Sequence, residues 1–283
     1  MNVLLAGAFG HLGGDILLEL VNQGHNVIAA DIVKREIKGL DESKVTFKKL
    51  DVTSKDSLKG ICNGVDVVIS TVGLTKISAE LNNYQIDFQG NLNLLNEAKI
   101  SGVKNFVYIS VIRANECKKA PMVHAKFLFE EELKKSNLSY CIHRPTGYFY
   151  DILKVFKAMI DKGQVNLLGK KDYKCNVVDT PDFAKFIVRH MLDKNVTYNV
   201  GGQETYTYKE IAELCFKAAN KEIVIKRAPT FLFSLLASLP KNKKNGKSAG
   251  LQFAKFIMTH DLIGDSKTGT ASFKEYIKES FKS

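Results

Sequence analysis

Short apolar runs alternate with longer amphipathic segments along the first half of the chain. Each run has the length and composition of a strand buried on both faces of a sheet. Between the runs, apolar residues recur every three or four positions, as on the buried side of a helix. This alternation predicts an α/β protein with a parallel sheet, right-handed crossovers and helices on both faces. The expected strands cover residues 3–6, 25–31, 45–51, 65–70, 103–110 and 139–144, and the clearest helices about 12–21, 87–99 and 124–135.

Glycines stand at positions 7, 10 and 13, between the first strand and the first helix. Gly7 permits a sharp turn, Gly10 lets the backbone approach a pyrophosphate, and Gly13 lets the helix pack closely on the strand. The helix N-terminus adds free N–H groups and a partial positive charge. These features predict a doubly wound Rossmann sheet that binds a dinucleotide; a tight turn without a ligand is the simpler alternative. The other loop residues assigned to the cofactor are Phe9, His11 and Leu12.

The pattern becomes less regular after Pro145. We expect helices over about 148–161, from Pro181 and from Tyr208, and strands near 175–179, 197–202 and 222–226. The basic segment 240–250 has the composition of a mobile loop. Because no polar linker separates the halves, we assign residues 1–145 to the NAD(P)-binding domain and 146–283 to a smaller substrate-binding lobe interleaved with the sheet.

Composition narrows the classes of partner. The 283 residues carry a net charge of +11, yet the lysines are spread along the chain and no nucleic-acid-binding motif accompanies them. We therefore expect no nucleic acid partner; a solvated basic surface is the simplest interpretation, and anionic ligands, acidic partners or membranes are the alternatives. The five cysteines are scattered without a Cys-x-x-Cys pair, which favours free thiols in a reducing cytoplasm and no metal site.

No targeting or membrane-spanning segment is expected. The first strand starts at the beginning of the chain, and no apolar run reaches the roughly 20 residues that cross a bilayer. The apolar segment 231–239 could wall a substrate pocket or rest on a membrane near Lys241, Lys243, Lys244 and Lys247. Packing against the rest of the protein is the interpretation we favour.

Asp31 ends the second predicted strand, 18 residues after Gly13. A carboxylate at this place can accept both hydroxyls of the adenosine ribose and repels a 2′-phosphate, so it favours NAD. Lys34 and Arg35 follow closely and could bind that phosphate, which makes NADP the alternative. The alternative is that Asp31 has only a structural role and caps a turn or a helix.

The fourth predicted strand ends in four small or short residues at the edge where such a sheet binds its cofactor. Small side chains there would let a nicotinamide ribose lie close; a plain exit from the strand is the alternative. The four residues are Ser70, Thr71, Val72 and Gly73.

The three-residue spacing of Gly7, Gly10 and Gly13 resembles the extended and atypical short-chain dehydrogenases/reductases. The resemblance implies that Asp51 and Val52 contact the adenine. It also implies a catalytic Ser, Tyr and Lys, with the Tyr about a dozen residues after the Ser. The first and last roles fall on Ser110 and Lys126, and Lys126 would also hold the cofactor ribose.

Met122 occupies the tyrosine position of this pattern. A thioether cannot donate a proton, so alcohol–ketone chemistry through that acid is not expected. His124 is a substitute acid by its chemistry, and a surface or capping histidine is the alternative.

The stretch Arg144-Pro145-Thr146-Gly147-Tyr148, with 108–114 and 124–130, resembles the NmrA-like branch of the atypical class. That branch includes isoflavone-reductase-like enzymes and divinyl chlorophyllide 8-vinyl reductases. The resemblance implies that Pro145, Thr146 and Gly147 line the nicotinamide pocket. Tyr148 is then another candidate proton donor.

Together these features predict an NAD(P)-dependent oxidoreductase that transfers hydride to an apolar, conjugated small molecule. Such an acceptor tolerates the loss of the usual tyrosine, because its proton can come from His124, Tyr148 or water. Met122 also supports a second hypothesis, a non-catalytic NAD(P)H sensor or assembly factor. A nucleotide-sugar epimerase or dehydratase ranks third, because those relatives normally need a tyrosine at the position that Met122 occupies.

Overall fold

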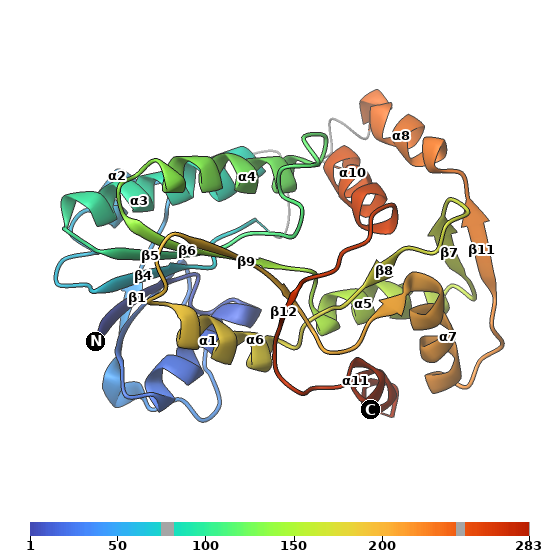
Figure 1. Cartoon of the computed structure of the whole chain (residues 1–283), viewed down its shortest axis with the longest axis horizontal. Helices are drawn as coiled ribbons and strands as arrows, with labels where there is room; N and C mark the ends of the chain where they lie inside the picture. The colour runs from blue at the N-terminus through green and yellow to red at the C-terminus, as the bar shows by residue number, and fades with distance from the viewer. Residues whose placement is uncertain (75–81, 242–246, 283) are drawn as a thin grey trace.

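An eight-stranded sheet with parallel neighbours forms the centre of the computed structural model, which describes residues 1–74, 82–241 and 247–282 (Figure 1). The strands are β1 (Asn2–Ala6), β2 (Asn26–Asp31), β3 (Val45–Lys49), β4 (Val67–Ser70), β5 (Asn105–Ile109), β6 (Ser139–Pro145), β9 (Val196–Gly201) and β12 (Ser266–Lys267). Their order is β12-β9-β6-β5-β4-β1-β2-β3. All pairs in the sheet are parallel. The predicted doubly wound α/β fold is confirmed.

Helices cover both faces of this sheet (Figure 1). On one face lie α1 (His11–Asn22) and α6 (Thr180–His190), which also contact each other. On the other face lie α2 (Lys55–Leu58), α3 (Asn91–Ile100) and α4 (Pro121–Lys134). Because neighbouring strand residues point to opposite faces, the apolar runs supply two separate hydrophobic cores.

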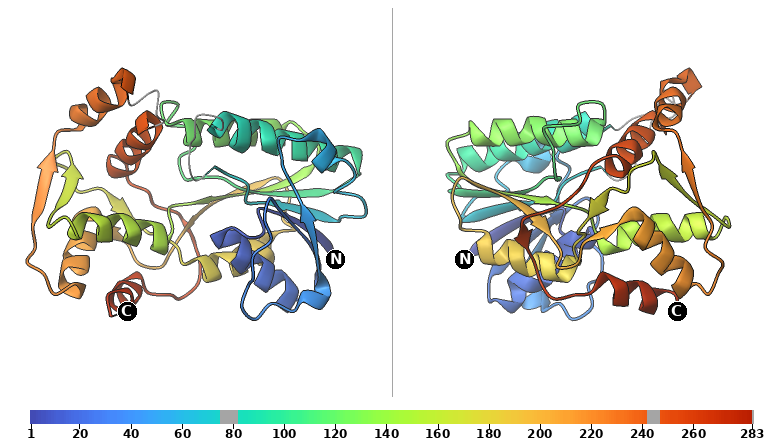
Figure 2. Two further views of the ribbon diagram at one scale, coloured as in Figure 1. Left: turned by 180° about the vertical axis from the view of Figure 1, so that it is seen from behind. Right: turned by 45° about the vertical axis from the view of Figure 1, so that its right-hand side comes forward.

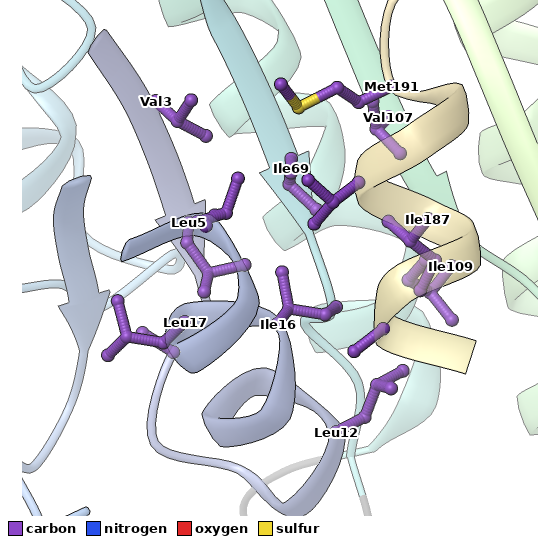
Figure 3. Packing of buried hydrophobic residues seen from close by; sticks show 14 of the residues in the cluster. Val3, Leu5, Leu12, Ile16, Leu17, Ile69, Val107, Ile109, Ile187 and Met191 are labelled. Atoms are coloured by element: carbon purple, nitrogen blue, oxygen red, sulfur yellow. The ribbon is translucent and has the colours of Figure 1, made fainter. Parts of the chain in front are cut away.

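The core beneath α1 follows the pattern predicted from its sequence (Figure 3). Leu12, Ile16 and Leu17 of this helix are buried against Leu5 of β1 and Ile69 of β4. Side chains at these helical spacings lie on one side of a helix, so one apolar stripe is enough to seat α1 on the sheet.

A third core lies in the lobe built from the second half of the chain. Its helices are α5 (Phe149–Ile160), α7 (Tyr208–Ala218), α8 (Thr230–Ser238), α10 (Lys247–Met258) and α11 (Phe273–Ser280), and its strand pairs are β7 (Val165–Leu168) with β11 (Ile225–Ala228) and β8 (Lys174–Cys175) with β10 (Tyr206–Thr207). Strands β9 and β12 return to the main sheet, so the lobe and the sheet share one chain path. The boundary at residue 145 stays a prediction.

Several element boundaries differ from those expected. Before α3, residues Tyr84–Gly90 form a π-helix, η2, and α4 begins at Pro121 rather than at 124. Proline suits a first helical turn because its missing N–H has no partner there. The expected strand near 175–179 is limited to β8, and that near 222–226 is shifted to β11.

The prediction of a loop over residues 240–250 is partly wrong. Lys247 begins α10, so the last four of these residues are helical. Residues 242–246, including Lys243 and Lys244, lie outside the described part of the chain.

Candidate functional site

The carboxyl ends of the parallel strands meet at one edge of the sheet. From β1 the chain continues through β2 and β3 on one side, and then through β4, β5 and β6 on the other. Ligands of open α/β sheets bind where the strand order reverses in this way. The candidate site is therefore the edge between the ends of β1 and β4 and the strands beside them.

The glycine turn at this edge is fixed by steric contacts. Gly7 has φ +81°, and a Cβ there would lie 2.5 Å from the hydroxyl oxygen of Thr71. A Cβ on Gly13 would lie 2.0 Å from the carbonyl oxygen of Gly7. Neither position accepts a side chain without moving the backbone. Thr71 also donates its hydroxyl to the carbonyls of Ala6 and Gly7, which fastens the turn to the exit of β4.

Gly10 differs from these two glycines because it borders open space. A Cβ there would meet only the Gly7 carbonyl oxygen, at 3.4 Å. Gly10 is also the N-cap of α1, and the first turn of that helix contains no acidic residue and no side-chain cap. The first turn of α1 therefore leaves its N–H groups without an acidic side chain or cap of its own, which fits a pyrophosphate.

Asp31 lies at the end of β2, directly beside this turn. Its carboxylate accepts hydrogen bonds from the backbone N–H of Phe9, at 2.9 Å, and of Ile32, at 2.7 Å. The carboxylate is partly exposed, so its remaining lone pairs can reach a ligand. Lys34 and Arg35 are both exposed, and Lys34 forms an ion pair with Glu42 at 2.9 Å.

Asp51 and Val52 have structural partners of their own. The Asp51 carboxylate accepts from the hydroxyl and the N–H of Thr53, and these hydrogen bonds lower its pKa. Val52 is buried against Gly90, where a Cβ would come within 2.5 Å of the valine. An open groove of about 500 Å³ adjoins this turn, lined by Thr53, Asn82, Tyr84, Gln85, Phe88, Gln89 and Asn93.

Ser70 is buried and hydrogen-bonded within the protein. Its hydroxyl donates to the Asn91 side-chain oxygen at 2.6 Å, while the Asn91 amide donates to the carbonyls of Val72 and Asp87. This network fixes the backbone that leaves β4. The structure therefore gives the Ser70 side chain a positioning contact, and leaves the backbone of residues 71–73 at the edge.

An ion pair between Lys126 and Asp87 lies next to Gly73. The lysine nitrogen is 3.5 Å from the Asp87 carboxylate and donates to the Ile109 carbonyl at 3.1 Å. Asp87 is fully buried and also accepts from the N–H of Leu74 and the amide of Asn83. The ammonium group is therefore held at the ends of β4 and β5.

Ser110 lies at the end of β5, one residue beyond the carbonyl that Lys126 contacts. Its hydroxyl is buried and has no hydrogen-bond partner among the described residues. The Tyr108 hydroxyl below it is likewise without a partner in the described chain, and burial near Asp87 raises its pKa well above the ordinary value. The structure thus brings Ser110 and Lys126 to the same edge, as the sequence predicted.

His124 is not brought together with Lys126. It lies two positions away on α4, which places it on a different side of the helix. Its Nδ1 is 3.0 Å from the hydroxyl of Tyr84, and the two rings meet edge to face. Met122 does share the side of Lys126, one helical turn earlier, and packs against the third core.

The segment from Pro145 to Tyr148 crosses the end of β6. Thr146 is buried, and its hydroxyl donates to the Asn176 carbonyl at 2.7 Å. Gly147 has φ +133°, a region that favours glycine, and its carbonyl accepts from Val178. The turn is therefore held to the segment before α6, and its backbone remains at the edge.

A row of aromatic rings leads from the glycine turn to this segment. The ring of His11 packs on Tyr150 with centroids 3.9 Å apart, and Tyr150 stacks on Tyr148 at 5.6 Å. Burial raises the pKa of both tyrosines. Burial also raises the pKa of Asp151, although the Tyr150 hydroxyl and His11 oppose the effect.

Sequence reasoning missed Asp87, Asn91 and Tyr150. Asp87 and Asn91 are four residues apart, a spacing that places both on one helical side, and this signal was available. Their partners come from β4 and α4, however, so only the tertiary structure identifies what they hold.

Residues 1–74, 82–241 and 247–282 contain neither a metal-binding cluster nor a membrane-spanning helix. None of these residues form a group of three or more His, Cys, Asp or Glu side chains able to hold a metal ion. In the same part of the chain, every helix is too short or too polar to cross a bilayer.

Structural comparison finds the same fold in solved structures of two reductases. The triphenylmethane reductase of Citrobacter superposes with a TM-score of 0.75 at 20% identity, and all of both chains is covered. An NADPH-dependent quinone oxidoreductase of Escherichia coli superposes with a TM-score of 0.75 at 18% identity, covering 99% of this chain and 100% of that one. These likenesses show the fold.

Sequence comparison gives two kinds of relative. The photosystem II assembly factor Ycf39 of Synechocystis is 27% identical over 244 residues, covering 85% of this chain and 74% of that protein. The divinyl chlorophyllide a 8-vinyl-reductase of Arabidopsis thaliana is 29% identical over 271 residues, covering 85% of this chain and 64% of that protein.

The assignment of the chain to a family rests on its match to a family model. The model of the NmrA-like family matches residues 1–255, and so covers both the glycine turn and most of the second lobe. The resemblance inferred from the Pro-Thr-Gly turn is confirmed. The chain belongs to the NmrA-like family.

Proposed function

We propose that this protein is an NAD(P)H-dependent reductase of an apolar, conjugated small molecule. The observation that carries the proposal is the shared edge of the sheet. There an anion-binding helix start, the Asp31 carboxylate and the Lys126 ammonium group lie at the ends of neighbouring strands. A dinucleotide laid along this edge would meet all three groups. Residues 1–145 would bind it, and residues 146–283 would carry the substrate.

The residues fit NAD better than NADP. The Asp31 carboxylate can accept ribose hydroxyls, and it would repel a 2′-phosphate. Lys34, which could balance that phosphate, is paired with Glu42. Arg35 keeps NADP as the alternative cofactor.

A bound nicotinamide dinucleotide would supply the hydride. Lys126 would hold the ribose hydroxyls, and its position is maintained by Asp87 and the Ile109 carbonyl. The Ser110 hydroxyl, which has no hydrogen-bond partner among the residues that the structure describes, could orient the acceptor. The backbone of Thr146 and Gly147 would border the same space from the end of β6.

The proton would come from Tyr148 or water. Tyr148 directly follows the Pro-Thr-Gly turn, and its phenol is protonated at neutral pH; burial raises its pKa, which makes it a weaker acid than an exposed tyrosine. His124 is engaged with Tyr84 on another side of α4. A conjugated acceptor needs no acid at the position of Met122, and the quinone, triphenylmethane and vinyl reductases among the similar proteins support this substrate class.

A second candidate function is an NAD(P)H-reading assembly factor. It is favoured by Met122, which removes the usual acid, and by the similarity to Ycf39. This protein would bind the same cofactor without oxidising it.

We also propose that the protein works in a reducing compartment such as the cytoplasm. All five cysteines are free thiols, and burial raises the pKa of Cys62, Cys141, Cys175 and Cys215 to about 12. These four thiols behave as small apolar residues of the cores.

The deciding experiment is a titration with NADH and NADPH, followed by stopped-flow oxidation of the bound cofactor by a panel of quinones and enones. Tight binding with oxidation would support the reductase, and tight binding without oxidation would support the assembly factor. Gly10→Val is the matched variant, because its side chain would fill open space at the turn. It should fold normally and lose binding; unchanged affinity would remove the dinucleotide from this edge.

A further inference from the structure

Helix α8 turns its large apolar side chains toward solvent. Phe231 is 64% exposed, Leu232 38%, Leu235 56% and Leu239, at the end of the helix, 43%. The expectation that this segment packs against the rest of the protein is therefore wrong for these residues. Contiguous exposed apolar surface in a folded protein marks a place of interaction.

The exposed stripe is a consequence of how α8 is seated. Residues 231, 235 and 239 are four apart, so they form one row along the helix. The opposite side packs on α10: Ala237 is buried, and the Ser234 hydroxyl accepts from the Lys255 ammonium at 2.6 Å. Because that side is already used, α8 cannot bury both sides in the protein.

Helix α8 also lies at an extremity of the molecule. In Figure 1 and in both views of Figure 2 it projects beyond the sheet and its covering helices, with α10 and β11 beside it. A broad surface could therefore reach the apolar row without meeting the nucleotide-binding half.

Among its charged side chains, the segment that contains α8 has only basic ones, although one of them, Arg227, is ion-paired with Asp172 from another segment. From residue 223 to residue 260 the sequence contains no Asp or Glu. Lys226 and Lys241 are exposed near the two ends of the helix. The cations of this stretch are Lys226, Arg227, Lys241, Lys243, Lys244, Lys247 and Lys255.

We propose that α8 docks the protein on the surface of a membrane that contains anionic lipids. The apolar row would enter the boundary between headgroups and acyl chains, and the flanking lysines would face lipid phosphates. At 9 residues the helix is about 14 Å long, too short to cross a bilayer, so it would lie in the plane of the surface. Lysine is depleted at the centres of protein–protein interfaces, which makes a protein partner the weaker match.

Vesicle flotation with the full chain tests the proposal. Vesicles of phosphatidylcholine with about 30% phosphatidylglycerol should retain the protein, and phosphatidylcholine alone should retain it more weakly. The double variant Phe231→Ser with Leu235→Ser should lower binding at least about tenfold. Lys226→Glu with Lys241→Glu should remove the preference for anionic vesicles. Ile100→Ser, an 82% exposed apolar residue elsewhere, is the matched control and should bind normally.

The result that would overturn the proposal is equal binding by the double variant and the unaltered protein, or no binding to either vesicle. Sedimentation equilibrium in buffer adds a second readout. A dimer that Phe231→Ser with Leu235→Ser dissociates, without vesicle binding, would make α8 a contact between copies and would also overturn the membrane assignment. The proposal does not depend on cofactor binding, so it can fail independently of the reductase assignment.

Discussion

The glycine turn is tightly packed within the protein, whereas helix α8 exposes large apolar side chains to solvent. At the turn, Thr71 leaves no room for a Cβ on Gly7, and the backbone of Gly7 and Ala8 leaves none for a Cβ on Gly13. On α8, Phe231 and Leu235 are more than half exposed, so the described residues leave space around these side chains. A substitution at a tightly packed position such as Gly13 is expected to affect both the stability of the fold and the binding of a ligand. A substitution at an exposed apolar position is expected to affect only contacts with molecules outside the chain.

Gly13→Ala tests the constrained side most severely. Its Cβ would lie 2.0 Å from the Gly7 carbonyl oxygen, so we expect unfolding to become easier by about 3 kcal/mol and NADH binding to be lost. Gly14→Ala is the control, because its Cβ meets only the Ile37 side chain at 3.5 Å. Urea unfolding measures both variants. Equal stability of the two would mean that the turn has more freedom than its contacts indicate.

Lys126→Met should have the next largest effect. It leaves the fully buried Asp87 carboxylate without its cation, so the free energy of unfolding should fall by about 3 kcal/mol and NADH affinity should fall with it. Lys135→Met, at the exposed end of the same helix, should cost less than about 1 kcal/mol. If chemical denaturation gave the same loss for both variants, Asp87 would not depend on Lys126.

Burial of His143 makes the stability of the protein depend on pH. Burial lowers its pKa to about 3, far below the value near 6.5 expected in the unfolded chain. The unfolded state therefore binds the proton first, and stability is complete above pH 6.5 and declines toward pH 3. From pH 7.5 to 5.0 the loss due to this residue is about 2 kcal/mol. His143→Phe, compared by urea unfolding at both pH values, should remove that part of the loss; an unchanged acid sensitivity would assign it to other groups.

Asp31→Ala should discriminate between the two cofactors. We expect about a tenfold loss of NADH affinity and a smaller loss for NADPH, because the variant removes the ribose acceptor and the repulsion of a 2′-phosphate together. Fluorescence titration of both cofactors measures the ratio. Equal losses would leave Asp31 as a structural anchor of the Phe9 N–H only.

Leu235→Ser should have the smallest effect on stability. The side chain is 56% exposed, so the free energy of unfolding should change by less than about 0.5 kcal/mol. A thermal unfolding scan is sufficient to see this. A large destabilisation would show that α8 is buried in solution and would remove the contrast with the glycine turn.

The parts of the site that were predictable from sequence depend on local sterics and strand order. Gly7, Gly10 and Asp31 take their places from a strand, a turn and a helix that are adjacent in the sequence. Ser110 and Lys126 were identified through the resemblance to short-chain dehydrogenases/reductases, and the structure brings both to the same edge.

Other features depend on contacts between distant segments. The role of Asp87 depends on its ion pair with Lys126, 39 residues later in the chain. His124 does not join the predicted site, because its hydrogen-bond partner is Tyr84. For residues 231–239 the sequence shows an apolar segment, but the side that remains uncovered is decided by how α8 meets α10. Periodicity alone does not contain that information.

The π-helical turn at Tyr84–Gly90 sets the length of the chain at this point of the fold. A π-turn contains one residue more than an α-turn, and the helix on either side of it keeps its direction. Removing one residue between Asp87 and Asn91 would therefore leave an ordinary α-turn with both side chains on the same side of the helix, whereas the same deletion within α3 would rotate one end of that helix by about 100° relative to the other. We expect a single codon deletion in this turn to be tolerated better than one in α3, so the length of the chain can change here without moving the ion pair of Asp87 with Lys126.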